Sequence, residues 1–379
     1  MDKTVKTIAL ELQPCCGKRS GIGTYTYELA KRLKSDDEIQ FCGNLFNFCG
    51  RNDNSEALQG IDMDITVRKL MPYGVYRRIW DLLPITYENL FPKKVALNLF
   101  FNFIVPPKMR GKIITTVYDM TYVRFPETMD ARNLRRISAG MERSAKRSDR
   151  IITISEFSKR EIIDLLGVPE EKISVIYSAP SFSEETADSE VTLGKYGITK
   201  PYILYVGTIE PRKNLVRLIH AFEMLKRNEK LPYRLVLAGG KGWQNEEIYR
   251  AAKESPFAED IIFTGYISNS ERNCLYQNAE LFAFPSLYEG FGMPPLEAMH
   301  WGCPVVTSDA ASMPEICGDA TALVNPLDEE DIVKGIMAVL SDKEYAESLR
   351  KKGYEREKKF TWETSAQQLI SVCKEVLGE

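Results

Sequence analysis

The chain has 379 residues, of which 44% are hydrophobic and 27% charged, with a net charge of −3. This is the composition of a globular protein of two or three domains, and the near-neutral charge argues against nucleic acid as a partner. Only two histidines, His220 and His300, are present. A zinc site or a Ser-His-Asp hydrolase would have to use one of these two, and we expect both to be structural.

The eight cysteines form no C-x-x-C pair, so we expect reduced thiols rather than a disulfide framework. No signal peptide is visible at the N-terminus. The uncharged run at residues 95–107 is shorter than the ~20 residues that a spanning helix needs. The sequence therefore predicts a cytoplasmic protein without a transmembrane segment.

In the first half, short apolar runs alternate with amphipathic stretches, which is typical of an α/β fold. The pattern predicts strands at residues 4–12, 112–118, 150–154 and 173–177, and helices at residues 24–34, 134–147 and 157–166. A loop at residues 14–23 would join the first strand to the first helix.

Basic residues are concentrated in this half. Residues 66–112 contain nine Lys or Arg against two acids, and residues 131–150 contain seven against two. Tyr73, Tyr76, Trp80 and Phe91 are interleaved with the first run. The pattern fits solvated helix faces. It also fits a surface that binds the inner face of an anionic membrane or a phosphate-bearing acceptor.

Residues 181–190 contain four Ser or Thr and four acids in ten positions, which is typical of a linker. Beyond them, the sequence predicts strands at residues 202–206, 233–238, 261–264, 281–284 and 304–307, with helices between them. Two such arrays indicate two doubly wound, Rossmann-like domains that face each other across a cleft. We expect domains at residues 1–182 and 196–361, with a last helix, within residues 362–379, that packs back on the first domain.

Three segments carry candidate chemistry. The first is K-R-S-G-I-G-T-Y at residues 18–25, between the first strand and the first helix. Gly21 and Gly23 allow close backbone approach, and a helix N-terminus favours an anion. A plain tight turn fits this segment equally well.

The second segment is G-T-I-E-P-R-K-N, from Gly207 to Asn214, at another strand-to-helix turn. Two adjacent cations, Arg212 and Lys213, lie at the carboxyl end of a strand and beside a helix N-terminus. This placement suits a diphosphate. The alternative is solvated surface charge.

The third segment is S-L-Y-E-G-F-G-M-P-P-L-E-A-M at residues 286–299. Gly290 and Gly292 would expose backbone N–H groups, and the two prolines suit the start of a helix. Glu289 would precede this loop and Glu297 would lie in the first turn of the helix, so both should border one cavity. The alternative is a capped helix start with two solvated acids. Acidic clusters at residues 36–38 and 62–64 are expected in loops without converging partners, and no metal is predicted.

In this order, the three segments resemble those of the family 4 retaining glycosyltransferases of the GT-B fold. The similarity covers nearly the whole chain, including F-T-W-E at residues 360–363. The resemblance implies that Arg212 and Lys213 hold the donor diphosphate and that Glu297 accepts hydrogen bonds from the ribose. It also implies that Glu289 grips the donor sugar. The further donor-binding positions that it implies are Gly21, Gly23, Gly207, Tyr266, Phe291, Gly292 and Met293.

One segment departs from the family pattern. Many relatives have His-Asp after a strand of the first domain, where this chain has Tyr118 and Asp119. We keep both as donor-site positions, but a tyrosine hydroxyl exchanges protons poorly near neutral pH. The imidazole-assisted step of such relatives is therefore in doubt here.

The resemblance implies a retaining, metal-independent enzyme that needs no cofactor beyond its nucleotide-sugar donor. Mannose from GDP-mannose is the first expectation, because the G-T-I-E-P-R-K-N turn resembles that of bacterial polysaccharide mannosyltransferases. The acceptor would be a saccharide or a lipid-linked saccharide in cell-surface polysaccharide synthesis. UDP-glucose, UDP-N-acetylhexosamine and dTDP-deoxysugar donors stay open. Two other functions also stay open: a UDP-sugar epimerase and a non-catalytic nucleotide-sugar-binding subunit. Tyr118 would favour the non-catalytic subunit.

Overall fold

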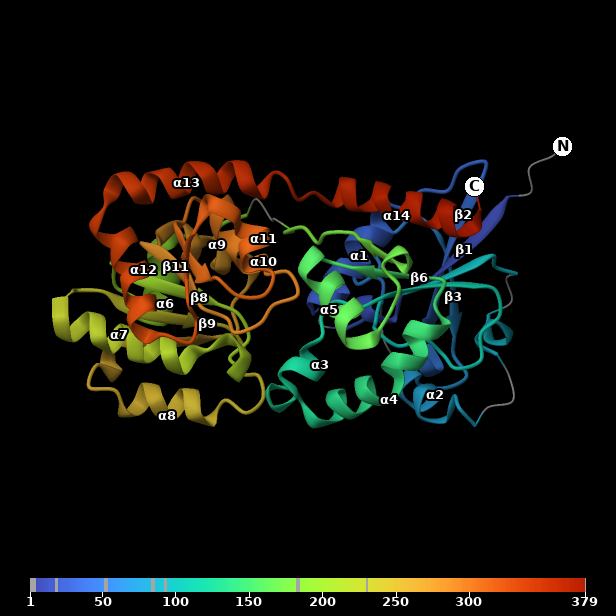
Figure 1. The fold of residues 1–379 in the computed structure, drawn as a ribbon, viewed down its shortest axis with the longest axis horizontal. Helices are drawn as coiled ribbons and strands as arrows, with labels where there is room; N and C mark the ends of the chain where they lie inside the picture. The colour runs from blue at the N-terminus through green and yellow to red at the C-terminus, as the bar shows by residue number, and fades with distance from the viewer. Residues whose placement is uncertain are drawn as a thin grey trace. The chain divides into compact units, whose positions relative to one another are not determined.

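The computed structural model describes residues 5–17, 20–50, 54–82, 86–91, 94–181, 185–229 and 231–378. These residues form helices around two parallel sheets, which confirms the predicted α/β class (Figure 1). The chain divides into two compact units. Unit 1 contains Met1–Tyr122, Ala131–Ser178 and Thr361–Glu379, and unit 2 contains Val123–Asp130 and Ala179–Phe360.

The sheet of unit 1 has seven parallel strands in the order β3-β2-β1-β4-β5-β6-β7. The strands are β1 (Lys6–Glu11), β2 (Ile39–Phe46), β3 (Asp64–Arg68), β4 (Leu97–Phe100), β5 (Lys112–Thr116), β6 (Arg150–Thr153) and β7 (Ile173–Val175). Helices cover both faces, so central positions such as Ile8, which pairs with Phe41 and Leu97, are fully buried. The strand order reverses between β1 and β4, the kind of point where doubly wound sheets bind ligands.

The helices of unit 1 are α1 (Gly21–Arg32), α2 (Tyr73–Ile79), α4 (Ala131–Arg147), α5 (Glu156–Leu166) and α14 (Trp362–Leu377), while α3 (Thr121–Arg124) passes from unit 1 to unit 2. Helix α1 begins three residues earlier than predicted, because Ser20 caps it by accepting a hydrogen bond from the Gly23 N–H. The predicted loop before it also contains a short 3₁₀ turn, Gln13–Cys15.

Three strands of unit 1 were not predicted from the sequence, namely β2, β3 and β4. We had expected the acidic cluster at residues 62–64 to lie in a loop. This is wrong for Asp64, which is the first residue of β3. Strand β3 is an edge strand with exposed positions. Strand β4 has only four residues, and its one polar residue, Asn98, is buried with the rest of the strand.

The sheet of unit 2 has six parallel strands in the order β10-β9-β8-β11-β12-β13. The strands are β8 (Tyr202–Val206), β9 (Arg234–Ala238), β10 (Ile261–Gly265), β11 (Leu281–Phe284), β12 (Val305–Ser308) and β13 (Ala322–Val324). All but β13 were predicted, because each contains a run of apolar residues; β8 and β11, at the centre of the sheet, are buried throughout. Here the order reverses between β8 and β11.

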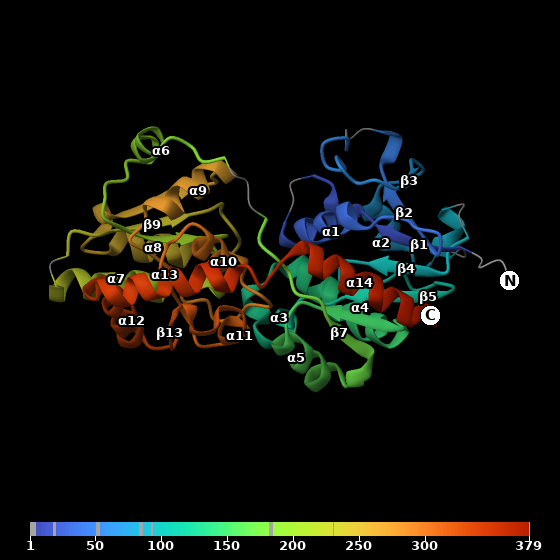
Figure 2. The same cartoon turned by 90° about the horizontal axis from the view of Figure 1, so that it is seen from above.

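The helices of unit 2 are α6 (Ser189–Tyr196), α7 (Leu215–Glu229), α8 (Glu246–Glu254), α9 (Asn269–Asn278), α10 (Met293–His300), α11 (Met313–Cys317), α12 (Glu329–Ser341) and α13 (Lys343–Glu357) (Figure 2). A 3₁₀ turn, η6 (Pro211–Lys213), precedes α7, and Asn214 closes it in the left-handed conformation, with φ of 61°. The Asn214 side chain donates to the carbonyls of Pro285 and Pro326, so it holds three loops together.

After α13 the chain returns to unit 1 and ends in α14, which packs on α1. The Trp362 ring lies 5.7 Å from that of Tyr25, and the Ser365 hydroxyl donates to the Tyr177 carbonyl. Residues 123–130 group with unit 2, which the sequence did not indicate. In the expected linker, residues 182–184 lie outside the described residues.

No helix in the part of the chain that the structure describes is long and apolar enough to cross a membrane.

Candidate active site

The predicted cations and the first predicted glutamate lie at the reversal point of the second sheet. Turn η6, with Arg212 and Lys213, follows β8, and the loop that carries Glu289 follows the neighbouring strand β11. Because the strands are parallel, both loops leave the same edge of the sheet. Residues 77 positions apart in sequence are thereby brought into contact.

Glycines allow the loops after β8, β9 and β10 to pack tightly. The Gly207 N–H donates to the Ala238 carbonyl, and the Gly239 N–H donates to the Gly265 carbonyl. A Cβ atom on Gly239 would lie 1.8 Å from the Gly207 carbonyl oxygen, and one on Gly207 would lie 2.6 Å from the Tyr205 hydroxyl. The structure thus gives Gly207 a packing function, which fixes the start of the loop that leads to Arg212.

Four charged side chains form a buried cluster in these loops. The Glu289 carboxylate lies 2.5 Å from Lys213 Nζ and 2.9 Å from Arg212 Nη1. Arg212 Nη2 lies 3.0 Å from Glu210, which is almost fully buried, and Nη1 also donates to the Tyr288 carbonyl. Two cations and two carboxylates balance, so the cluster carries no net charge.

The cluster keeps Glu289 ionised. Burial would raise the pKa of Glu289, but the charges of Arg212 and Lys213 lower it to about 2. The Ser286 hydroxyl donates a further hydrogen bond to the same carboxylate, at 2.6 Å. The carboxylate is therefore charged near neutral pH.

The loop after Glu289 leads directly into α10. Gly292 caps α10 with φ of 94°, and a Cβ atom there would lie 2.1 Å from Met313 Cε. Phe291 is buried against Phe360, with ring centroids 5.4 Å apart. The Ser312 hydroxyl lies 2.9 Å from the Glu289 carbonyl oxygen and 3.0 Å from that of Phe291. These contacts fix the backbone of residues 289–293.

Glu297 has separate partners. We had expected Glu297 in the first turn of the helix. It is the fifth residue of α10 and therefore lies in the second turn. Its carboxylate lies 3.2 Å from Arg272 Nη1, and it accepts a hydrogen bond from the Tyr276 hydroxyl, both from α9. That Glu289 and Glu297 border one cavity stays a prediction.

The predicted positions in unit 1 are placed differently from expectation. Gly21 and Gly23 lie in the first turn of α1, while Lys18 and Arg19 fall outside the described residues. Tyr118 is buried, and its hydroxyl donates to the Phe101 carbonyl at 2.8 Å. Burial raises its pKa well above the usual value. Its hydroxyl thus serves the core of unit 1, instead of being held out for a ligand.

Asp119 and Tyr266 are two further positions that the sequence predicted for the donor site. Asp119 accepts a hydrogen bond from the Thr121 N–H at the start of α3. Tyr266, which follows β10, is 65% exposed.

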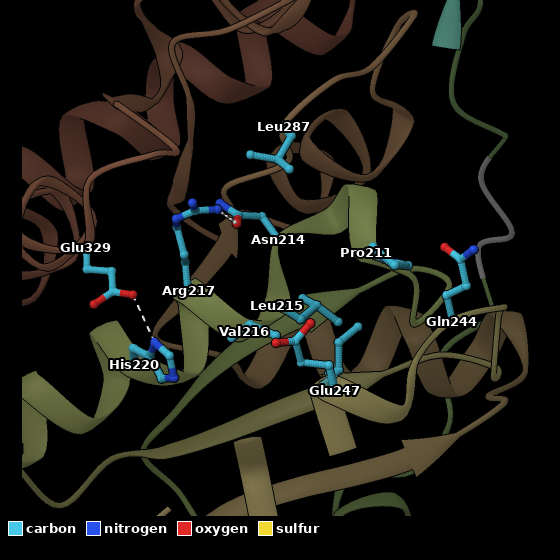
Figure 3. A pocket seen from close by; sticks show the side chains of 11 residues that line it. Pro211, Asn214, Leu215, Val216, Arg217, His220, Gln244, Glu247, Leu287 and Glu329 are labelled. Atoms are coloured by element: carbon cyan, nitrogen blue, oxygen red, sulfur yellow. Dashed lines mark hydrogen bonds and ion pairs between the residues drawn. The ribbon is translucent and has the colours of Figure 1, made fainter. Parts of the chain in front are cut away.

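A cavity of about 350 Å³ lies beside η6 in unit 2 (Figure 3). Pro211 and Asn214 of the turn region line it, but Arg212, Lys213 and the two glutamates do not. Figure 3 shows His220 paired with Glu329 in its wall, at 2.9 Å. His300 is paired with Glu357, at 3.3 Å. Among the described residues, no group of three or more His, Cys, Asp or Glu side chains could hold a metal ion.

Several site residues were missed at the level of sequence. Glu210 and Ser286 lie inside the candidate segments. Their closeness in sequence to Arg212 and Glu289 could have indicated that they belong to the site. Arg272 and Ser312 lie outside them and reach the site only through tertiary packing.

A doubly wound sheet with a buried cation pair at its reversal point is typical of enzymes that bind phosphorylated ligands. Two family models match the chain: "Glycosyltransferase Family 4" at residues 19–179 and "Glycosyl transferases group 1" at residues 190–356. The O-antigen chain mannosyltransferase B of Escherichia coli is 31% identical over 371 residues, which cover 94% of this chain and 96% of that protein. The O-antigen chain mannosyltransferase RfbU of Salmonella typhimurium is 30% identical over 59% of each chain.

Among solved structures, sucrose-phosphate synthase of Thermosynechococcus elongatus has the same fold. Its TM-score is 0.75, with 18% identity over 98% of this chain and 99% of that one. The chain therefore belongs to the group 1, family 4 glycosyltransferases and has the GT-B architecture, as predicted.

Proposed function

We propose that this glycosyltransferase moves mannose from GDP-mannose to a saccharide or lipid-linked saccharide in cell-surface polysaccharide synthesis. The cluster of Arg212, Lys213 and Glu289 is the observation that carries the proposal, because it contains two adjacent cations, the groups that pair with a diphosphate. The relationship to the E. coli O-antigen mannosyltransferase, over nearly the whole chain, supports mannose as the sugar.

In this proposal, unit 2 binds the donor and unit 1 binds the acceptor. Breaking the sugar–phosphate bond leaves an anionic nucleoside diphosphate, which fixed cations stabilise. Arg212 and Lys213 are held by Glu210 and Glu289 before the donor arrives. A bound diphosphate would share these cations with the two carboxylates, so the transfer needs no metal ion to supply positive charge.

The remaining donor contacts follow from the loops described above. Glu289 and the backbone of Phe291, Gly292 and Met293 would hold the sugar, while Glu297 would accept hydrogen bonds from the ribose. Glu297 is ready for this function because Arg272 keeps its carboxylate paired and oriented. Tyr266, exposed after β10, would border the nucleobase. We propose that the sugar is transferred with retention of its anomeric configuration.

Peripheral membrane association is a separate part of the proposal. Of the aromatic residues that suggested it, Tyr76, Trp80 and Phe91 are buried in a cluster and are not surface anchors. Leu70 and Leu82 are exposed in the same segment. We expect binding to phosphatidylglycerol vesicles that weakens as salt screens the charges, and equal binding to neutral vesicles would contradict it.

The donor-site proposal is tested with Arg212→Lys and Arg212→Ala. Removing a fixed donor to the leaving group should lower kcat by about 100-fold or more for the alanine variant. Arg227→Ala is the control, because Arg227 is exposed on α7 and its Nη2 atom lies 3.5 Å from Glu223, away from η6. Donor binding is followed by thermal shift with GDP-mannose, UDP-glucose, UDP-N-acetylhexosamine and dTDP-rhamnose. An Arg212→Ala variant with unchanged kcat would refute the assignment.

A further inference from the structure

A second cavity, of about 650 Å³, lies in unit 1 between α2 and α4. Both helices lie side by side in the lower part of Figure 1. Six arginines line the cavity, and we call it the arginine pocket: Arg77, Arg78, Arg132, Arg135, Arg136 and Arg143. Asp81 is the single acid in its lining.

The spacing of the α4 arginines explains why they converge. Arg132, Arg136 and Arg143 recur at helical spacing, so they lie on one face of the helix. Ala139 and Gly140, between Arg136 and Arg143, also line the pocket. A Cβ atom on Gly140 would lie 2.9 Å from Ile104, so the small residues let Ile104 form the floor of the pocket.

The arginines that line the pocket outnumber its one acid. Asp81 is paired with Arg143, at 2.8 Å. Arg136 is half-buried, and its Nε atom has no hydrogen-bond partner among the described residues. Burial and the charge of Arg77 lower the pKa of Arg136 to about 10. Partial burial of an arginine is unfavourable unless an anion pairs with it.

The remaining lining is apolar. The side chains of Trp80 and Ile104, both mostly buried, form part of the walls. Leu82, which follows the lining residue Asp81, is 81% exposed, and Val75, which follows the lining residue Gly74, is 42% exposed. Guanidinium groups match phosphate oxygens, and the apolar side chains match hydrocarbon, so the pocket suits an amphiphile with a phosphorylated head.

We propose that the arginine pocket binds the diphosphate group of a lipid-linked acceptor, with Arg136 as its central contact. This inference rests on the proposed function, since it assumes that unit 1 receives the acceptor. It adds the class of acceptor, a diphosphate-linked lipid, and the site that recognises it.

The test is binding of farnesyl diphosphate to the full chain, measured by calorimetry without any donor. The expected result is binding that farnesol does not reproduce and that inorganic pyrophosphate competes away. Arg136→Gln should weaken it by about 10- to 100-fold, the range for hydrogen bonds to a charged group. Arg78→Gln, at an exposed position, is a second variant that should also weaken binding if Arg136→Gln does not fold. Lys146→Gln is the matched control, because Lys146 lies on α4 outside the arginine pocket.

The phosphate could instead come from a membrane lipid, so phosphatidylglycerol vesicles form a second arm. We expect Arg136→Gln to bind these vesicles as the wild type does. Loss of vesicle binding in Arg136→Gln, without farnesyl diphosphate binding to the wild type, would make the pocket a headgroup site and overturn the proposal. Equal binding of farnesyl diphosphate by wild type and Arg136→Gln would also overturn it. Because the assay needs no turnover, it can succeed or fail whatever the donor proves to be.

Discussion

Lys213 shows how the candidate site holds charge out of water. Its side chain is almost fully buried, yet its ammonium group has the Glu289 carboxylate at 2.5 Å and the Phe284 ring at 5.3 Å. Arg212 is held in the same way by Glu210 and Glu289. Removing one partner from such a cluster leaves an unpaired buried charge, so each member matters for folding as well as for any reaction.

Substitution of Glu289 and substitution of Glu297 should affect different kinetic constants. Glu289 contacts both cations and would meet the reacting sugar, so Glu289→Gln should lower kcat by about 10- to 1000-fold. Glu297 would contact the ribose, which does not react. Glu297→Gln should therefore mainly raise KM for the donor, by an amount equivalent to roughly 1–3 kcal/mol. Steady-state kinetics of both variants, with folding checked by circular dichroism, measures the difference.

If Glu297→Gln abolished kcat while Glu289→Gln changed only KM, the two roles would be reversed. If neither variant changed the kinetics, both acids would be structural.

Glu11, at the end of β1, gives unit 1 a pH-dependent stability. The side chain is buried, and its Oε1 atom has no hydrogen-bond partner among the described residues. Burial raises the pKa of Glu11 to about 7, although the charge of Arg77 opposes the shift. The folded state therefore binds the proton more tightly than the unfolded state, whose pKa is near 4.5. Between these values the contribution of Glu11 becomes less favourable as pH rises, by about 1.4 kcal/mol per pH unit at most.

Glu11→Gln should remove this dependence and raise the free energy of unfolding at pH 8 relative to the wild type. Urea unfolding of both proteins at pH 5 and pH 8 is the measurement. Parallel pH dependences in the two proteins would show that Glu11 is not titrating in the folded state.

Among the elements, the glycine turns after β8 and β9 define the geometry beside η6. Gly239→Ala would place a methyl group 1.8 Å from the Gly207 carbonyl oxygen, so the two loops must separate. We expect a loss of about 1–3 kcal/mol in the free energy of unfolding, as for other overpacked sites, together with weaker donor binding. Gly240→Ala is the control in the same loop, because a Cβ atom there meets nothing within 4 Å. Equal melting temperatures for the two variants would contradict this account of the turn.

The elements also show how far the sequence could be read. Strands β8 and β11 were predictable because burial on both faces demands continuous apolar runs, such as Y-I-L-Y-V of β8. Strand β2 was not, since Gln40, Gly43 and Asn44 interrupt its pattern, and Gly43 lies against Leu12 in the fold. The start of α1 was misplaced because its glycines suggested a loop, whereas the Ser20 cap begins a helix there.

The sequence pointed to the charged residues of the candidate site but not to their partners. Arg212, Lys213 and Glu289 lie in segments whose local pattern already indicated an anion site. That Glu289 would neutralise both cations depends on β8 and β11 being neighbours. The contact between Arg272 and Glu297 depends on the packing of α9 against α10. Neither pairing is encoded in local spacing.

At the scale of the molecule, unit 1 is completed by the C-terminal helix, which follows the whole of unit 2 in sequence. Trp362 is buried against Tyr25, and Glu363 and Lys374 pair with Arg32 and Glu38. Trp362→Ala should therefore destabilise unit 1 by about 3–5 kcal/mol, the usual cost of truncating a buried aromatic side chain.

The measurement for this prediction is calorimetric unfolding combined with limited proteolysis that identifies the fragment lost first. Gln367→Ala, at an exposed position on the same helix, is the control. Loss of unit 2 before unit 1 in Trp362→Ala would contradict the assignment of α14 to unit 1.

The central claim is that this glycosyltransferase transfers mannose, and it is tested most directly by following the sugar. The wild type is incubated with radiolabelled GDP-mannose, or with radiolabelled UDP-glucose, together with a lipid-linked saccharide acceptor and EDTA. The account predicts labelled mannose in the acceptor product, joined in the α configuration of the donor, and no loss of activity with EDTA. Transfer of glucose but not mannose, inversion at the anomeric carbon, or isomerisation of the donor without transfer would contradict it.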